Sequence, residues 1–88
     1  MRFQFDPTKA ANSLRKHGVS FADAEGVFFD PLAIHREDPD AEGEERFVAV
    51  GLGSAGQFLV VVYVLRGDEI RVISARRATR REVRDYEG

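Results

Sequence analysis

The feature that most constrains this chain is an unbroken run of eight apolar residues, FLVVVYVL, at positions 58–65. A membrane-spanning helix needs about 20 such residues, so the run is too short to cross a bilayer. Most of its side chains are β-branched or aromatic, and such residues favour strands. A strand that is apolar at every position must be covered on both faces. We therefore expect residues 57–65 to form the central strand of a sheet.

Two neighbouring segments predict an antiparallel meander around this central strand. RFVAVGL (46–52) precedes it across the turn GSAG, and IRVISAR (70–76) follows it across the turn RGDE. Short links that contain glycine typically join antiparallel strands as hairpins. RFQF (2–5) alternates in polarity as a half-buried strand does. LAIHR (32–36) is a further candidate strand.

The first helix is indicated by the residues at both of its ends. Asp6 followed by Pro7 is typical of an N-cap and a first helical residue, and Gly18 is typical of the position just after a helix. The sequence therefore predicts a helix over residues 7–17. The residues expected on its inward side, at spacings of four and three, are Ala10, Leu14 and His17.

The second helix is indicated within residues 20–31. Ser20, with Asp23 three positions later, is typical of a helix N-terminus, and Asp30-Pro31 is typical of a helix end. The apolar side chains that this helix would carry are Phe21, Ala24, Val27 and Phe28.

The last helix is indicated by the segment T-R-R-E, in which Thr79 and Glu82 form a capping box. It is expected to run from about Arg80 to Glu87, with Arg80, Arg81 and Arg84 pointing outward and Thr79, Val83 and Tyr86 inward. Together these elements predict an α+β fold, a small antiparallel sheet with two N-terminal helices and a short C-terminal helix. We expect a single domain over residues 1–88, near the lower size limit for a core without disulfides or metals.

Composition excludes several classes of protein. The chain has no cysteine, which excludes disulfides, thiolate metal sites and cysteine nucleophiles, and makes the cytoplasm the default location. Its two histidines, His17 and His35, lie in separate segments, and no His/Asp/Glu cluster has metal-ligand spacing. GLGSAG (51–56) lies between two strands and opens no helix, so it is interpreted as a turn. We therefore expect no metal and no cofactor, and we interpret His35 as a surface strand residue.

Charge is distributed unevenly along the chain. Residues 1–46 carry a net charge of −4 and residues 47–88 a net charge of +2. Six arginines lie between positions 71 and 84, where Glu82 is the only acidic residue. Arg80 and Arg81 fall in the first turn of the predicted last helix, where the helix dipole disfavours positive charge. An anionic ligand would explain such a cluster, because arginine binds phosphate with two hydrogen bonds. The alternative is a solvated helix face.

Two other pairs carry groups that can take part in chemistry. Lys16 could hold a phosphate and His17 could transfer a proton, although both also suit a helix C-terminus without any further role. Glu45 beside Arg46 could be a general base next to a stabilising charge, or simply the end of an acidic loop.

The chain resembles the BrnT family of type II toxin–antitoxin ribonucleases in KHGVSF, E-E-R and ISARRAT, within stretches that cover nearly its whole length. Phe5 stands where many members of that family have tryptophan. The resemblance implies a fold similar to that of the RelE toxins and a metal-independent endoribonuclease that halts translation. It also implies a BrnA-type antitoxin as partner, which dimerises and represses the operon, so that operator DNA is met only through the complex. The residues that it implicates are Lys16, His17, Glu45, Arg46, Arg76, Arg77, Glu82 and Tyr86.

The expected reaction is attack of the RNA 2′-hydroxyl on the neighbouring phosphorus. In this scheme Arg76 and Arg77 clamp the phosphate, Lys16 adds a second stabilising charge, and either His17 or Glu45 accepts the proton. Arg80, Arg81 and Arg84, with Glu82 and Tyr86, are expected to bind RNA or a partner protein. The alternative is a noncatalytic binding module, for example an inactive toxin relative, whose basic C-terminal patch binds an acidic partner or operator DNA.

Overall fold

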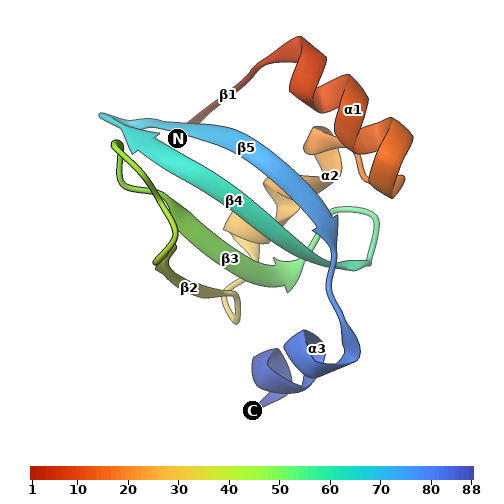
Figure 1. The fold of residues 1–88 in the computed structure, drawn as a ribbon. Helices are drawn as coiled ribbons and strands as arrows, with labels where there is room; N and C mark the ends of the chain where they lie inside the picture. Colours follow the sequence, from red (N-terminus) through yellow and green to blue (C-terminus); the bar gives the residue numbers. More distant parts are fainter.

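The computed structural model describes residues 1–88, and its secondary structure follows the expected order (Figure 1). The first and last helices lie within one or two residues of their expected bounds, and the strands within three. The second helix starts as expected, but it is α-helical only to Glu25 and continues to Phe29 as a 3₁₀ helix. The elements are β1 (Arg2–Phe5), α1 (Pro7–His17), α2 (Phe21–Glu25), the 3₁₀ helix η1 (Gly26–Phe29), β2 (Ile34–Glu37), β3 (Phe47–Leu52), β4 (Phe58–Arg66), β5 (Glu69–Arg77) and α3 (Arg80–Glu87). No helix has the length and hydrophobicity needed to cross a membrane.

The five strands form one sheet in the order β1-β5-β4-β3-β2. β4 lies at its centre, as its apolar run predicts, and the pairs β2–β3, β3–β4 and β4–β5 are antiparallel. β1, however, pairs with β5 in parallel, so the sheet is mixed and the expectation of an antiparallel sheet was wrong. Parallel neighbouring strands need a long connection, and here the connection is most of the chain. No short turn in the sequence therefore predicts this pairing.

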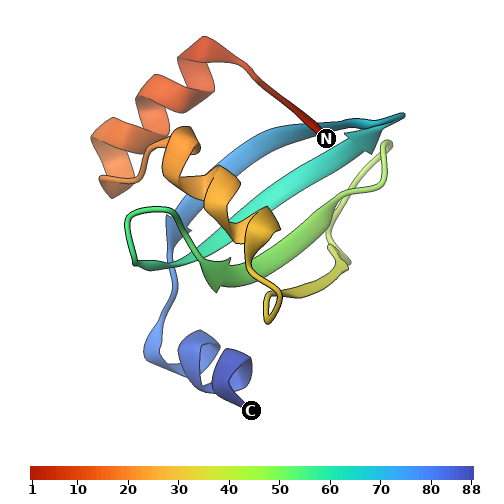
Figure 2. The same cartoon turned by 180° about the vertical axis from the view of Figure 1, so that it is seen from behind.

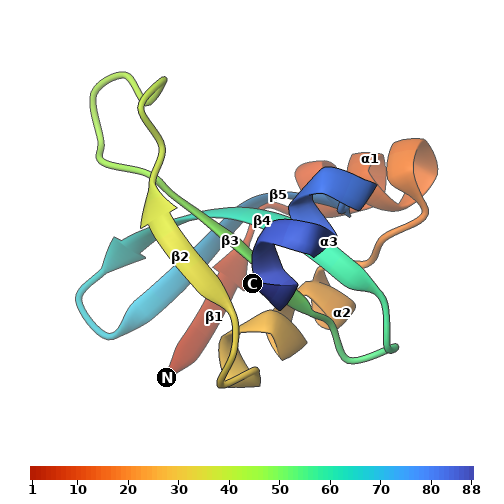
Figure 3. The same cartoon turned by 90° about the horizontal axis from the view of Figure 1, so that it is seen from below.

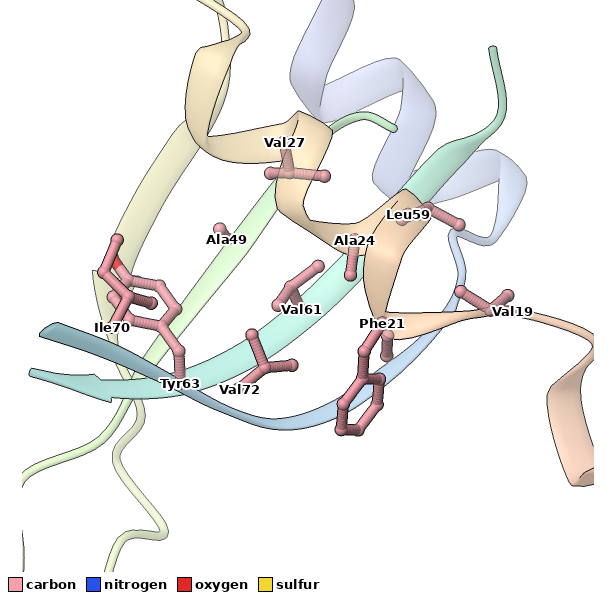
Figure 4. Packing of buried hydrophobic residues seen from close by; sticks show 11 residues of the cluster. Val19, Phe21, Ala24, Val27, Ala49, Leu59, Val61, Tyr63, Ile70 and Val72 are labelled. Atoms are coloured by element: carbon pink, nitrogen blue, oxygen red, sulfur yellow. The ribbon is translucent and has the colours of Figure 1, made fainter. Parts of the chain in front are cut away.

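The main hydrophobic core lies between one face of the sheet and α1, α2 and η1 (Figure 2). Alternate residues of β4, namely Leu59, Val61 and Tyr63, point into this core. Figure 4 shows them packed against Val27 and the other side chains of α2 and η1. Phe21, Ala24 and Val27 are buried as predicted, and Phe28 is half-buried.

The opposite side of the sheet has no helix over its middle (Figure 1). We call it the open face. It carries the intervening residues of the strands, including Val50, Val60, Val64, Arg71, Ser74 and Arg76. The three valines are buried among their strand neighbours although they lie outside the main core. The apolar run is therefore explained by burial on both faces, although α1, α2 and η1 cover only one of them.

Only part of the predicted inward side of α1 packs against the sheet. Ala10 is half-buried against the core as expected. Ser13 is buried, whereas the side chain of Leu14 is 56% exposed and His17 is also exposed. The hydroxyl of Ser13 lies 3.0 Å from the carbonyl oxygens of both Val19 and Ala75. β1 pairs with β5 only as far as Val72, so the free carbonyl of Ala75 needs this polar partner. Hydrogen bonding of this edge carbonyl by Ser13 therefore sets the orientation of α1, and Leu14 is left exposed.

The turn at residues 53–56 also serves as a packing surface. The N–H of Gly53 donates to the carbonyl oxygen of Gln57, which closes the predicted turn. The N–H of Ser54 donates to the carbonyl oxygen of Asp23 in α2. A Cβ on Gly26 would lie 2.3 Å from the nitrogen of Ser54, so a side chain at position 26 would force the helical segment off the hairpin.

α3 begins with the predicted capping box and packs against β3 (Figure 3). The ring of Tyr86 lies 5.1 Å from that of Phe58, and Val83 is half-buried. Thr79 is exposed, contrary to expectation, and Glu82 instead lies on the inward side. Arg80, Arg81 and Arg84 point outward as predicted.

Candidate nucleic-acid interface

A cavity of about 260 Å³ lies where α1 meets the outer edge of β5. Five of its residues come from one side of α1, since positions 9, 12, 13, 16 and 17 are related by spacings of three and four. No acidic residue lines it, and neither lysine in it makes an ion pair. The lining residues are Lys9, Asn12, Ser13, Lys16, His17, Ile73 and Ser74. We call this cavity the α1–β5 pocket; it is a concave surface of net positive charge.

The wall of the α1–β5 pocket is fixed by the fold. α1 starts at an N-cap, Asp6, whose carboxylate accepts a hydrogen bond of 2.8 Å from the N–H of Thr8. It ends at Gly18, whose backbone is left-handed with φ of 68°, a conformation that glycine adopts readily. The buried hydroxyl of Ser13 joins the helix to β5. The cationic side chains of the pocket therefore project from a helix that is held at both ends and at its middle.

The α1–β5 pocket borders the open face through Ser74 of β5. Ser74 pairs with Val62, and Arg76, two residues further along the strand, pairs with Val60. Two residues of a strand advance by about 7 Å, so a phosphodiester chain can contact both positions. Arg77 pairs with Leu59, a core residue, and therefore points to the opposite side of the sheet from Arg76. The expected clamp of two adjacent arginines is not formed on one surface.

Arg76 makes an ion pair with Glu82 that uses both carboxylate oxygens. Its Nη1 and Nη2 atoms each lie 2.8 Å from one oxygen of Glu82. Chiefly because of these hydrogen bonds, the pKa of Glu82 falls from 4.5 to about 2. The same bonds raise the pKa of Arg76. Glu82, in the first turn of α3, thus holds one of the six C-terminal arginines in place.

Glu45 and Arg46 lie away from the other candidates. A hydrogen bond and charge repulsion with the carboxyl group of Glu37, in edge strand β2, raise the pKa of Glu45. Arg46 lies 3.5 Å from the carboxylate of Asp38. β3 and β4 separate β2 from β5, so the sheet does not bring the pair to Lys16 and His17.

The remaining predicted residues lie on or near α3. Arg80, Arg81 and Arg84 are exposed and make no ion pair. Tyr86 is half-buried, and its hydroxyl donates to the carboxylate of Asp30. This residue therefore has a structural contact that its position in the sequence did not suggest. His35 is an exposed strand residue as predicted, and its Nδ1 lies 2.8 Å from the hydroxyl of Tyr63.

Sequence reasoning missed four polar residues of the α1–β5 pocket, Lys9, Asn12, Ser13 and Ser74. The signal for three of them was present, because positions 9, 12, 13 and 16 recur at helical spacing within a segment already assigned as a helix. Ser74 carried no such signal. β5 contains a register shift opposite Val62 and Tyr63, and this irregularity changes which residues of the strand share a face.

A mixed sheet covered on one side by α1, α2 and η1, with a cation-lined pocket at the border of its open face, defines a small α+β protein with a positively charged concave surface. The model of the BrnT family, described as the ribonuclease toxin of a type II toxin–antitoxin system, matches residues 5–82. The chain belongs to this family, as the resemblance in its motifs indicated. The structure is also similar to the crystal structure of the Brucella abortus ribonuclease toxin BrnT, with a TM-score of 0.66 and 25% identity, covering 91% of this chain and 99% of that one. Among curated protein sequences, none matches.

Proposed function

We propose that this chain is an endoribonuclease that binds the RNA backbone across the α1–β5 pocket and the adjoining open face. The observation that carries the proposal is the pocket itself, in which Lys9, Lys16 and His17 project into one concavity that no acidic residue lines. Unpaired cations in a concave site favour a polyanion, and membership of a ribonuclease toxin family favours RNA. Arg76 extends the same surface by one phosphate spacing.

The proposed reaction is attack of a 2′-hydroxyl on the adjacent phosphorus. Arg76 and Lys16 neutralise the charge that develops on the phosphoryl oxygens, and such fixed charges lower the barrier by several kcal/mol. His17 accepts the proton of the attacking hydroxyl. Of the two candidate proton acceptors, His17 is favoured over Glu45 because it shares the α1–β5 pocket with Lys16. The P–O5′ bond breaks and the leaving 5′-oxygen takes a proton from water, so the products are a 2′,3′-cyclic phosphate and a 5′-hydroxyl end.

In this proposal, side-chain cations supply all of the charge neutralisation. No three His, Asp or Glu side chains lie close enough together to hold one metal ion. The proposed enzyme accordingly needs neither a metal nor a cofactor, and its rate is expected to be independent of divalent cations. That expectation distinguishes it from nucleases whose metals bridge attacking and leaving oxygens.

The cellular role that we propose follows from the family. A type II toxin has a protein antitoxin, and we propose a BrnA-type antitoxin that blocks RNA cleavage and binds operator DNA as part of the complex. Cleavage of RNA in the cytoplasm then inhibits translation. We also propose that the fold is related to that of the RelE toxins.

A second candidate function is noncatalytic binding through α3. It is favoured by the outward position of Arg80, Arg81 and Arg84, which lie on the side of α3 away from Glu82 and Arg76. These exposed cations could dock an acidic partner protein or operator DNA without taking part in cleavage. The two candidates differ in one requirement, because only the nuclease depends on the 2′-hydroxyl.

The test is cleavage of a single-stranded RNA by the purified chain, with and without EDTA, beside an otherwise identical strand that lacks 2′-hydroxyls. We expect RNA to be cut at the same rate in EDTA and the deoxy strand to remain intact. Lys16→Ala with His17→Ala should lower the rate by at least 100-fold. Arg66→Gln is the matched control, since it removes a cation that Glu44 already neutralises at 2.9 Å. Loss of cleavage in EDTA, or equal cleavage of both strands, would refute the proposed mechanism.

A further inference from the structure

The Arg76–Glu82 pair leaves one edge of the guanidinium group free. Glu82 occupies the end formed by Nη1 and Nη2, and Nη1 also donates to the carbonyl oxygen of Arg77 at 3.2 Å. No protein acceptor lies at Nε, and Nη2 has a second hydrogen. The side chain of Arg76 is 45% exposed. The Nε–Nη2 edge can therefore bind two oxygens of a phosphate while Glu82 keeps its own two hydrogen bonds.

Glu82 is itself fixed by bonds that do not involve Arg76. Its Oε1 accepts a hydrogen bond of 2.8 Å from the N–H of Thr79, and its own N–H donates to the hydroxyl of Thr79 at 3.2 Å. Further along α3, Tyr86 anchors the helix to Asp30. The carboxylate of Glu82 thus belongs to a helix that is held at both ends, and its position does not depend on the arginine.

A fixed carboxylate matters because an arginine side chain has several rotatable bonds. Without a partner it would sample many rotamers on a sheet edge, and each encounter with RNA would have to restrict them. A guanidinium group that is already oriented loses less freedom when it contacts the transition state. If RNA and Glu82 instead competed for Arg76, RNA would have to break both hydrogen bonds that Arg76 donates to Glu82.

We infer that Glu82 is a positioning residue that holds Arg76 with its Nε–Nη2 edge available for a phosphodiester of RNA. This inference rests on the proposed function, since the phosphate is that of the RNA substrate. Glu82 does not touch the substrate in this arrangement. It acts through Arg76, and α3 thereby contributes to the site from outside the α1–β5 pocket.

The decisive variant is Glu82→Gln. Glutamine retains the capping box but offers only one acceptor and no charge to Arg76. The matched control is Glu87→Gln, an exposed residue of the same helix that makes no bond to Arg76. We expect Glu82→Gln to lower the single-turnover cleavage rate at least tenfold, with less than a threefold change in Kd for a noncleavable 2′-O-methyl RNA. Combined with Arg76→Ala, it should cause no further loss. Faster cleavage or tighter binding by Glu82→Gln would instead mean that Glu82 competes with RNA, and wild-type behaviour would mean that it has no role.

A second measurement separates this inference from the proposed function. The Nε–H resonance of Arg76 in NMR spectra should shift when 2′-O-methyl RNA binds to the wild-type protein, and this shift should be lost in Glu82→Gln. If the wild type cuts no RNA but shows the shift, the nuclease proposal fails while the positioning of Arg76 stands. If RNA binds and the Nε–H resonance does not move, the inference is overturned whether or not RNA is cut.

Discussion

The hydroxyl group of Tyr86 donates a hydrogen bond of 2.8 Å to the carboxylate of Asp30, which lies 56 residues earlier in the chain. The same carboxylate accepts hydrogen bonds from the N–H groups of Leu52 and Leu32. Burial raises the pKa of Asp30, but these hydrogen bonds outweigh it and lower the pKa below its ordinary value. One side chain thus joins α3, β3 and the segment after η1.

Tyr86→Phe should destabilise the protein by about 1 kcal/mol, because it removes a hydrogen bond to a charged acceptor while the ring stays packed on Phe58. Urea denaturation followed by circular dichroism measures this change. Asp85→Asn is the control, since Asp85 is exposed and makes no ion pair, and it should shift stability by less than about 0.5 kcal/mol. Equal stability of Tyr86→Phe and the wild type would show that the bond does not anchor α3.

Ser13→Ala should cost about 1–2 kcal/mol, because the hydroxyl group is buried and lies within hydrogen-bond distance of the carbonyl oxygens of Val19 and Ala75. Thermal melts compare it with Thr8→Ala, an exposed change near the start of the same helix. Only Ser13→Ala should also speed hydrogen exchange of the β5 amides. If the two variants melt together, α1 is not fastened to β5 through this hydroxyl.

Acidification should remove the stabilisation that comes from Glu82. Its folded-state pKa of about 2 lies below the ordinary value of 4.5, so the contribution is fully present above pH 4.5 and is lost as the pH falls toward 2. Because Arg76 is half-exposed, we expect the contribution to be roughly 1–2 kcal/mol. Denaturant titrations of the wild type and Glu82→Gln should give stability differences that shrink across this window. A difference that does not vary with pH would contradict the assignment.

Replacing Arg80 or Arg81 with glutamate should stabilise the fold by roughly 0.3–1 kcal/mol, because each lies in the first turn of α3, where the dipole favours negative charge. The same change should weaken RNA binding, and binding measured at several salt concentrations should show a shallower slope. Arg76→Ala should differ, with no gain in stability and the larger loss of cleavage. Glutamate variants that melt earlier yet cut RNA normally would show that these arginines are structural.

Local signals accounted for the helix ends and for two residues of the α1–β5 pocket. Asp6 and Gly18 bounded α1, and the capping box of Thr79 and Glu82 marked the start of α3. Capping depends on residues within one turn of each other, so it can be inferred from sequence. Lys16 and His17 were likewise identified, and they do lie in one pocket.

Other features depended on contacts between distant parts of the chain. The parallel pairing of β1 with β5 brings together segments from near the two ends of the sequence. Ser13 points inward because its hydroxyl bonds to a carbonyl of β5 that has no partner strand. The separation of Arg76 from Arg77 follows from strand alternation and was within reach of the sequence, but the bond from Arg76 to Glu82 was not.

The sequence by itself determined the elements, their order and the central position of β4, because capping, hairpin turns and an unbroken apolar run act over a few residues or through burial alone. Only the tertiary structure decided which cations share a surface. Sheet order separated Glu45 and Arg46 from the α1–β5 pocket, and the register shift in β5 set which of its side chains border that pocket. Both depend on pairing between strands, and the free energy of that pairing comes from residues far apart in the chain.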